Sequence, residues 1–257
     1  MSDMPAVQVG DGVEMPMVGF GTWQLRGKQA YDGVRGALDV GYRHIDTATM
    51  YGNEAEVGRA LRDSGLDRRE VFITTKLAPG RFGKERETIT ESLAGLGTDY
   101  VDLWLIHWPG RRSASSLKTW QEMRTLRSEG KARTIGVSNF NPSQVDELTS
   151  GTGETPAVNQ VPWSPSEHDP ALLAAFRERG VVVEGYSPLK NTNLKDRTLT
   201  EIAGAHGVTP AQVVLRWHIE LGIVVIPRSK RPERIASNFD LFGFSLTDDE
   251  VKRLSGR

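Results

Sequence analysis

The sequence predicts an α/β fold: a (β/α)8 TIM barrel with an N-terminal β-hairpin and a short C-terminal helix. Strand and helix patterns alternate along almost the whole chain, which favours a barrel of parallel strands. A doubly wound sheet is disfavoured, because Gly19-Phe20-Gly21 is followed neither by the third glycine of a dinucleotide-binding fingerprint nor by a helix start. The 257 residues suit one barrel without a linker, so we expect a single domain over residues 1–257.

The hairpin and the strands are predicted from short apolar runs rich in β-branched residues. A Gly10-Asp11-Gly12 turn joins Val7-Gln8-Val9 to Val13-Glu14-Met15, which is typical of a hairpin. The eight barrel strands are expected at residues 18–23, 43–46, 71–76, 101–107, 134–139, 157–160, 181–186 and 223–227.

The helices are predicted between these strands, where apolar residues recur at helical spacing. Asn141-Pro142, Asp169-Pro170 and Thr209-Pro210 each place a proline directly after a capping residue, which indicates a helix start. A capping box at Thr247-Asp248-Asp249-Glu250 opens the final short helix. The helices before this last one are expected near residues 29–40, 54–64, 84–96, 117–129, 142–148, 170–179, 209–221 and 232–239.

Composition excludes several classes of function. A net charge of −1 and a pI near 6.5 provide no basic field for nucleic acid or an anionic membrane. The chain has no cysteine, which excludes disulfides, thiolate metal sites and a cysteine nucleophile. Neither a signal peptide nor an apolar run of about 18 residues is present. We therefore expect a cytoplasmic monomer. We also expect no metal, because the spacing of His44, His168, His206 and His218 is not that of metal ligands.

Four titratable residues follow predicted strands and define a candidate site. Asp46, Lys76 and His107 each end an apolar run, and Tyr51 follows shortly after the first. Because the carboxyl ends of all barrel strands meet at one face, these residues should converge there. Each alone could be a capping residue, a solvated strand end or a core histidine. Together an acid, a phenol, an amine and an imidazole are the groups needed to protonate a substrate oxygen.

The segment from Asp46 to Glu54, Asp-Thr-Ala-Thr-Met-Tyr-Gly-Asn-Glu, is the most specific in the chain. It resembles the aldo-keto reductase superfamily, whose barrels carry Asp-Thr-Ala-x-x-Tyr-x-Asn-Glu after the second strand. The likeness is closest to compact bacterial members similar to 2,5-diketo-D-gluconate reductase. Further matches follow in family order between Gly21 and Asn238, at Thr75-Lys76 and at residues 105–109, 136–140, 159–160, 186–189 and 226–229.

This resemblance implies a role for each of the four residues. Tyr51 would be the general acid, with a pKa that falls from about 10 because of the nearby Lys76 ammonium. Asp46 would pair with Lys76 and hold it in place. His107 would bind and orient the substrate carbonyl. The implied reaction is the NADPH-dependent reduction of aldehydes, ketones or keto sugars to alcohols, because side chains alone cannot deliver a hydride.

The resemblance also implies where NADPH binds. Ser138, Asn139 and Gln160 would hold its carboxamide, and Tyr186 would stack on its ring. Ser187 and Leu189 would meet the pyrophosphate, and the polar segment 190–197 would fold over it. The basic run from Arg228 to Arg234, including Ser229, would bind the 2′-phosphate at a helix start. Other implied contacts are Gly21, Thr22, Trp23, Asp46 and Asn238, with Ser237 where many relatives have a glutamate for adenine.

Substrate specificity is less clearly indicated. Trp23, Met50 and Trp108 are candidates for an apolar pocket wall beside Tyr51 and His107. The few residues after the last predicted helix lead us to expect an open, permissive pocket. Two alternatives remain at this point. Lys76 could be the nucleophile of a Schiff-base aldolase, although pairing with Asp46 would keep its amine protonated. The chain could also be a non-catalytic NADP-sensing regulatory barrel.

Overall fold

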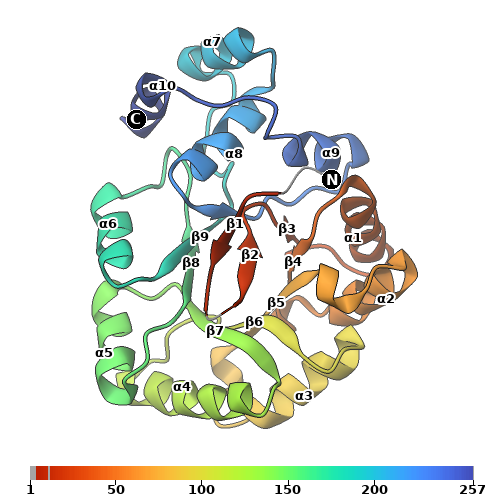
Figure 1. Cartoon of the computed structure of the whole chain (residues 1–257), viewed down its shortest axis with the longest axis vertical. Helices are drawn as coiled ribbons and strands as arrows, with labels where there is room; N and C mark the ends of the chain where they lie inside the picture. Colours follow the sequence, from red (N-terminus) through yellow and green to blue (C-terminus); the bar gives the residue numbers. More distant parts are fainter. Residues whose placement is uncertain (1–3, 11, 257) are drawn as a thin grey trace.

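The computed structural model describes residues 4–10 and 12–256, except the side chains of residues 113 and 114. Within these residues, eight parallel strands follow one another in chain order around a single sheet (Figure 1). They are β3 (Phe20–Gly21), β4 (His44–Asp46), β5 (Phe72–Leu77), β6 (Val101–Ile106), β7 (Ala132–Ser138), β8 (Val158–Pro162), β9 (Val182–Tyr186) and β10 (Val224–Val225).

The first and last strands of this sheet also meet. The backbone N–H of Gly19 donates to the carbonyl of Val225 at 2.9 Å, and the N–H of Val225 donates to that of Met17 at 2.9 Å. Val18 and Val225 accordingly form a parallel bridge. These bonds close the sheet into a barrel, which confirms the predicted fold class.

Helices surround the barrel on its outside (Figure 1). The predicted caps Asn141, Asp169, Thr209 and Thr247 are confirmed, because each side chain accepts a hydrogen bond from a backbone N–H of the first turn. The helices are α1 (Lys28–Val40), α2 (Glu54–Ser64), α3 (Glu85–Leu96), α4 (Ser113–Ser128), α5 (Pro142–Thr152), α6 (Pro170–Glu178), α7 (Arg197–His206), α8 (Pro210–Glu220), α9 (Pro232–Phe239) and α10 (Asp248–Ser255).

The predicted hairpin is present as β1 (Ala6–Gln8) and β2 (Glu14–Pro16). Asp11 of its turn lies outside the described residues. The hairpin crosses one end of the barrel (Figure 1), where Met15 joins Phe72 and Leu103 in an apolar cluster. This packing closes the amino end of the barrel, so a polar site is left to the opposite, carboxyl end.

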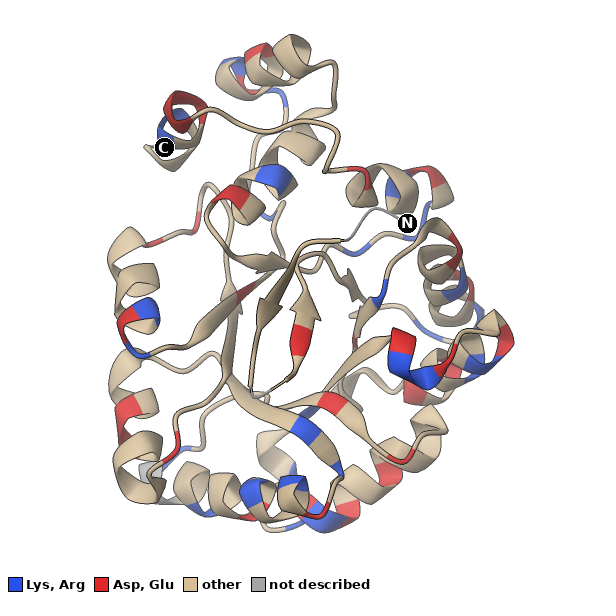
Figure 2. Ribbon diagram, viewed as in Figure 1, with Lys and Arg blue, Asp and Glu red and all other residues tan. Residues whose placement is uncertain are grey.

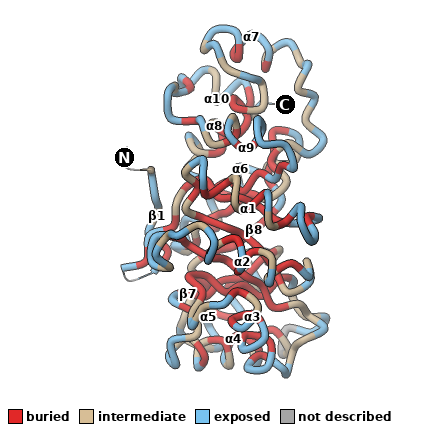
Figure 3. The backbone as a smooth tube through the Cα atoms, turned by 90° about the vertical axis from the view of Figure 1, so that its right-hand side faces the viewer, coloured by how far each residue is buried: buried red, intermediate tan, exposed pale blue. Residues whose placement is uncertain are grey.

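The outside of the molecule is charged and exposed, whereas its centre is buried. Most charged residues belong to the outer helices and loops (Figure 2), while the strands run through the buried centre (Figure 3). Buried exceptions on the strands include Asp46, Lys76 and Glu184. Buried charges require partners, so these residues mark a specialised region. Among the described residues, no helix combines the length and apolar character needed to cross a membrane.

The main difference from the predicted elements is α7, which forms where only a loop was expected. Asp196 caps this helix by accepting hydrogen bonds from the N–H groups of Thr198 and Leu199. Leu199 and Ile202 bury one face of it. The cap lies inside the polar segment 190–197, and that polarity concealed the helix start from a hydrophobic pattern.

Boundaries differ by a few residues elsewhere. β3 is short because the chain leaves the sheet after Gly21 and turns at Trp23. α4 begins at Ser113 instead of residue 117, and α5 continues to Thr152 instead of residue 148. None of these differences moves a strand out of the barrel.

Candidate active site

The carboxyl ends of the strands surround a cavity of about 750 Å³, a size typical of ligand sites. Asp46, Tyr51 and His107 line it, and Lys76 is fully buried beside Asp46. The structure therefore brings together the four residues predicted to be catalytic. The predicted cofactor and substrate residues that also line the cavity are Gly21, Trp23, Met50, Trp108, Ser138, Asn139, Gln160, Tyr186, Ser187, Leu189 and Arg228.

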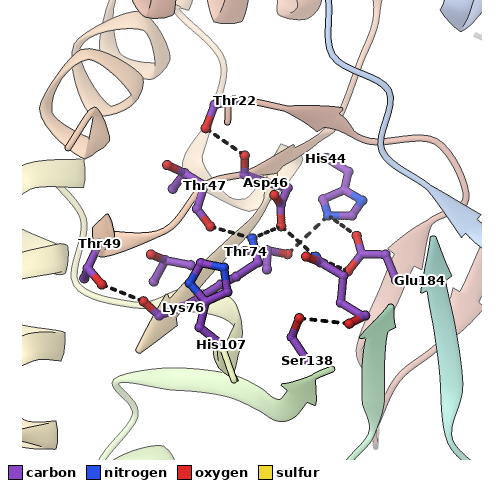
Figure 4. A network of polar contacts seen from close by, with 12 residues as sticks. Thr22, His44, Asp46, Thr47, Thr49, Thr74, Lys76, His107, Ser138 and Glu184 are labelled. Atoms are coloured by element: carbon purple, nitrogen blue, oxygen red, sulfur yellow. Dashed lines mark hydrogen bonds and ion pairs between the residues drawn. The ribbon is translucent and has the colours of Figure 1, made fainter. Parts of the chain in front are cut away.

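Lys76 and Asp46 form a buried ion pair. They come from the neighbouring parallel strands β4 and β5, whose register places Asp46 beside Thr74. Lys76 Nζ donates to Asp46 Oδ2 at 2.5 Å and to the carbonyl of Thr47 at 2.8 Å (Figure 4). Burial lowers the pKa of Lys76, but the charge of Asp46 and the other neighbouring groups raise it more, so its net pKa is raised. Lys76 is therefore a cation.

Tyr51 lies at the end of a short 3₁₀ helix, η1 (Thr49–Tyr51). The Thr49 hydroxyl donates to the carbonyl of Lys76 at 2.8 Å, which ties this turn to β5. Lys76 Nζ lies 5.2 Å from the centroid of the Tyr51 ring. Burial raises the pKa of Tyr51 and the Lys76 charge lowers it, with a net rise. The expected lowering by Lys76 is thus present, but burial outweighs it.

His107 follows β6 and faces Tyr51. The two rings are edge to face, with centroids 5.8 Å apart. Burial lowers the pKa of His107 to about 3, and the charge of Lys76 acts in the same direction. The imidazole is therefore neutral at pH 7 and carries one N–H. Its Nδ1 has no hydrogen-bond partner among the described residues.

Ser138, Asn139 and Tyr186 form a second group beside the four residues predicted to be catalytic. Asn139 donates to the carbonyl of His107 at 3.0 Å and to Ser138 Oγ at 2.9 Å, and it accepts from the Tyr186 hydroxyl at 2.8 Å. Its φ is +63°, a left-handed conformation that costs energy for a residue with a side chain. The surrounding bonds hold Asn139 in this conformation at the edge of the cavity.

Gln160 connects the ion pair to a carboxyl group that the sequence did not single out. Its Nε2 donates to Asp46 Oδ2 at 2.9 Å and to Glu184 Oε2 at 2.8 Å. Glu184 is fully buried on β9 and lies near His44, a histidine to which no role was assigned (Figure 4). The signal available in the sequence was one acidic residue inside the apolar run Val-Val-Glu-Gly.

The predicted phosphate-binding region follows β10. Arg228, Lys230, Arg231 and Arg234 are exposed, and none forms an ion pair with a described residue. They lead into α9, whose N-terminus has no side-chain cap and therefore keeps N–H groups available. Four unpaired cations at a helix start are suited to an anion.

Some predicted cofactor residues do not reach the cavity itself. Its lining includes Arg228 but not Ser229, Arg234 or Asn238, which lie in the adjoining loop and α9. Thr22 is buried, and its hydroxyl donates to the carbonyl of Asp46 at 2.9 Å. Polar lining residues that the sequence did not indicate are Gln24 and Arg26, whereas Lys190 belongs to the segment 190–197 that was expected to fold over the pyrophosphate.

The outer part of the cavity is apolar. Trp23, Met50 and Trp108 are 52%, 61% and 47% exposed, although each is large and apolar. All three line the cavity beside Tyr51 and His107. Exposed apolar side chains gathered at one opening are typical of a ligand-binding surface. Across the described residues, no group of histidine and acidic side chains could hold a metal ion.

Comparisons with known proteins show the family and the fold of the chain. A model of the aldo/keto reductase family matches residues 17–256. An aldo-keto reductase from Mycolicibacterium smegmatis is 46% identical, over 98% of this chain and 90% of the relative. A 2,5-diketo-D-gluconic acid reductase B from Corynebacterium sp. is 43% identical, over 100% and 94%. The crystal structure of an aldo-keto reductase from Bombyx mori in complex with NADP has a TM-score of 0.93 at 35% identity, over 100% and 93%.

Proposed function

The chain belongs to the aldo/keto reductase family, and we propose that it is an NADPH-dependent reductase of aldehydes, ketones or keto sugars. The single observation that carries this proposal is the buried Lys76–Asp46 pair beside Tyr51 and His107, at a cavity that also reaches Arg228. The Corynebacterium relative is named for a diketo acid, and the silkworm structure holds NADP. The first name supports a carbonyl substrate, and the second supports NADP as the cofactor.

Tyr51 is the proton donor in this proposal. Its hydroxyl gives a proton to the carbonyl oxygen as negative charge develops there, and the nearby ammonium of Lys76 stabilises the phenolate that remains. Asp46 keeps Lys76 charged and in place through the 2.5 Å contact. The pKa of Tyr51 is raised from its ordinary value near 10, so the phenol is protonated at neutral pH, as an acid must be before it reacts.

His107 orients the substrate. Because its pKa is lowered to about 3, it is a neutral imidazole and donates one N–H without competing for the proton of Tyr51. The edge-to-face contact with Tyr51 directs both rings toward the same region of the cavity. A carbonyl oxygen between them can accept from both, which fixes the carbonyl for attack.

The residues present fit a nicotinamide nucleotide. Both N–H groups of Gln160 are engaged by carboxyl groups, so its carbonyl oxygen is available to accept from a carboxamide. Ser138 and Asn139 lie beside it, and Tyr186 offers a ring for stacking. When bound, the nicotinamide supplies the hydride. At the other end, the exposed Arg228 and Arg234 would bind the 2′-phosphate.

The substrate end favours small carbonyl compounds with an apolar part. Trp23, Met50 and Trp108 offer apolar surface next to Tyr51, which would bind the carbon skeleton of a substrate. An aldolase that uses Lys76 is disfavoured, because a lysine with a raised pKa is a poor amine nucleophile.

The proposal is tested with a panel of small aldehydes, ketoses and diketones, each incubated with NADPH and with NADH. We expect loss of reduced-cofactor absorbance with several carbonyls and faster turnover with NADPH. Borohydride treatment with substrate should not label Lys76. Tight NADPH binding without turnover on any carbonyl would favour a cofactor-sensing barrel instead, and covalent labelling of Lys76 would favour an aldolase.

A further inference from the structure

Glu184 is a buried carboxyl group for which the proposed reaction has no use. It lies on β9, is 0% exposed, and its side chain lies with those of Asp46 and His44 in the barrel interior (Figure 4). Burying a carboxyl group inside a barrel is unfavourable unless it has partners or loses its charge. Its contacts therefore call for a specific explanation.

The first contact fixes the orientation of an amide. Gln160 Nε2 carries two hydrogens, and it lies 2.9 Å from Asp46 Oδ2 and 2.8 Å from Glu184 Oε2. Two oxygen acceptors define which end of the amide is nitrogen, because a flipped amide would set its oxygen against both of them. The carbonyl oxygen of Gln160 therefore remains for a ligand in the cavity that Gln160 lines.

The second observation concerns the charge of Glu184. Lys76 bonds to Asp46 and to the carbonyl of Thr47, with no bond to Glu184. Burial, together with the negative charge of Asp46, raises the pKa of Glu184 to about 8. At neutral pH, Glu184 is then uncharged, and the cation Lys76 faces a single anion, Asp46.

The location of the acidic proton follows from the unused oxygen. Glu184 Oε1 has no hydrogen-bond partner among the described residues, and it lies 3.6 Å from Nε2 of His44. Burial lowers the pKa of His44 to about 3, so this imidazole is neutral. Nδ1 of His44 lies 3.4 Å from the carbonyl of Pro16, and Nε2 lies 3.2 Å from the Thr74 hydroxyl, so both ring nitrogens have nearer partners than Glu184 Oε1. Because Oε2 accepts from Gln160, the acidic proton belongs on the unbonded Oε1.

We propose that Glu184 is a positioning residue, a neutral carboxylic acid whose Oε2 locks the Gln160 amide so that its carbonyl oxygen meets the nicotinamide carboxamide. This inference rests on the proposed function for the identity of the ligand. In this proposal, Asp46 and Glu184 both accept hydrogen bonds from Gln160, but they differ in charge. Asp46 carries the charge that Lys76 needs, and Glu184 supplies the second acceptor without a second charge.

Neutrality matters because Lys76 serves Tyr51 as well. An ionised Glu184 would add negative charge near Lys76, and this charge is one of the causes that raise the pKa of Tyr51. The titratable groups that interact with Glu184 are Asp46, Lys76, His44 and Tyr51. Since His44 is neutral, no second cation offsets a charge on Glu184. Reduction should therefore slow as the pH rises through about 8 and Glu184 ionises.

Infrared difference spectroscopy of the cofactor-free protein tests the protonation state directly. We expect a C=O band of a protonated carboxylic acid at pH 6 that is absent in Glu184→Gln and fades above pH 8. The matched control is Glu85→Gln, which removes another buried glutamate that does not line the cavity and should leave this band in place. If Glu184→Gln leaves the spectrum of acid groups unchanged at pH 6, Glu184 is ionised and the proposal is wrong.

NADPH titration, followed by quenching of tryptophan fluorescence, tests the positioning role. Glu184→Gln keeps an oxygen acceptor and should bind NADPH within about threefold of the wild type, which is within about 0.7 kcal/mol. Glu184→Leu leaves one Gln160 N–H without an acceptor and should bind roughly tenfold more weakly. With deuterated NADPH, the leucine variant should also transfer from both nicotinamide faces, whereas the glutamine variant uses one.

The outcomes separate the two proposals. Equal NADPH affinity and one-face transfer in both variants would overturn the positioning role, and so would equal losses in both. If the leucine variant does not fold, the glutamine variant still tests the proposal. It must keep the NADPH affinity and face selectivity of the wild type, and its reduction rate must no longer fall above pH 8. A wild-type chain that binds no NADPH would overturn the proposed function, and the infrared band would still decide the charge of Glu184.

Discussion

The two ends of the cavity hold their charges in opposite ways. At the end proposed to be catalytic, Lys76 is 0% exposed and pairs with Asp46 at 2.5 Å. At the other end, Arg228 and Arg234 are exposed and have no acidic partner among the described residues. One region is complete before any ligand binds, whereas the other keeps its cations available.

Because of this difference, the buried end should affect the stability of the fold, and the exposed end should affect the affinity for an anion. A buried pair is desolvated when the chain folds, so removal of one partner leaves an uncompensated charge and destabilises the fold. Exposed cations keep their hydration, so their loss has little effect on folding and acts on the binding of an anion instead. Substitutions at the two ends should therefore change different measurements.

Lys76→Met should have the largest effect, because it acts on both stability and catalysis. The buried carboxylate of Asp46 loses its cation, which destabilises the protein by about 3–5 kcal/mol. Turnover should fall by at least about 100-fold at neutral pH, since the phenolate of Tyr51 is no longer stabilised. Chemical denaturation and steady-state kinetics measure the two effects. A variant as stable and active as the wild type would show that the pair is not a unit.

Tyr51→Phe tests chemistry without charge. It removes the proton donor and keeps the ring, so we predict a fall in kcat of at least about 100-fold, with NADPH affinity nearly unchanged. Stability should change little compared with Lys76→Met, because no buried charge loses its partner. Turnover close to that of the wild type would exclude Tyr51 as the acid.

The buried end should also determine how stability depends on pH. The folded-state pKa of His44 is about 3, below its unfolded value of about 6.5, so the unfolded chain binds the proton first. The stabilisation is fully present above pH 6.5 and is lost as the pH falls toward 3. The slope should approach about 1.4 kcal/mol per pH unit for this one group. His44→Gln should flatten the slope in urea unfolding between pH 6.5 and 4; an unchanged slope would contradict burial as its cause.

Neutralising the exposed end should change cofactor choice but not stability. Replacing both Arg228 and Arg234 with glutamine should weaken NADPH binding by about 1.5 kcal/mol for each contact, the low end for charged hydrogen bonds because both side chains are exposed. NADH binding and unfolding should be nearly unchanged. Lys118→Gln, an exposed cation on α4, is the matched control. Equal losses for NADPH and NADH would contradict a 2′-phosphate site.

Salt should produce the smallest effect, and only at the exposed end. The preference for NADPH over NADH should shrink as ionic strength rises, because salt screens the attraction between exposed charges, with a Debye length of about 10 Å at 0.1 M. The kcat for a bound substrate should change less, since Lys76 and Asp46 are shielded from solvent. A kcat that falls as steeply as NADPH affinity would remove the distinction between the two ends.

The sequence predicted the barrel and the convergence of the site residues, and its resemblance to a known family implied the ion pair. Apolar strands that end in Asp46 and Lys76 are local patterns, and a closed parallel sheet brings all such ends to one face. Capping residues such as Asn141 and Thr209 located helix starts, because a cap acts within its own turn. The helix α7 escaped prediction because its cap lay in a polar segment.

Only the tertiary structure decided how the site is balanced. Burial, which no local pattern states, raises the pKa of Tyr51 although Lys76 is close. Gln160 meets Glu184 because β8 and β9 are neighbouring strands whose register pairs the two residues, and it meets Asp46 because β4 lies across the closed barrel from them. Glu184 appeared in the sequence as a lone acid in an apolar strand. Its environment became known only when the closed barrel placed it beside His44, because desolvation and charge act through space and not along the chain.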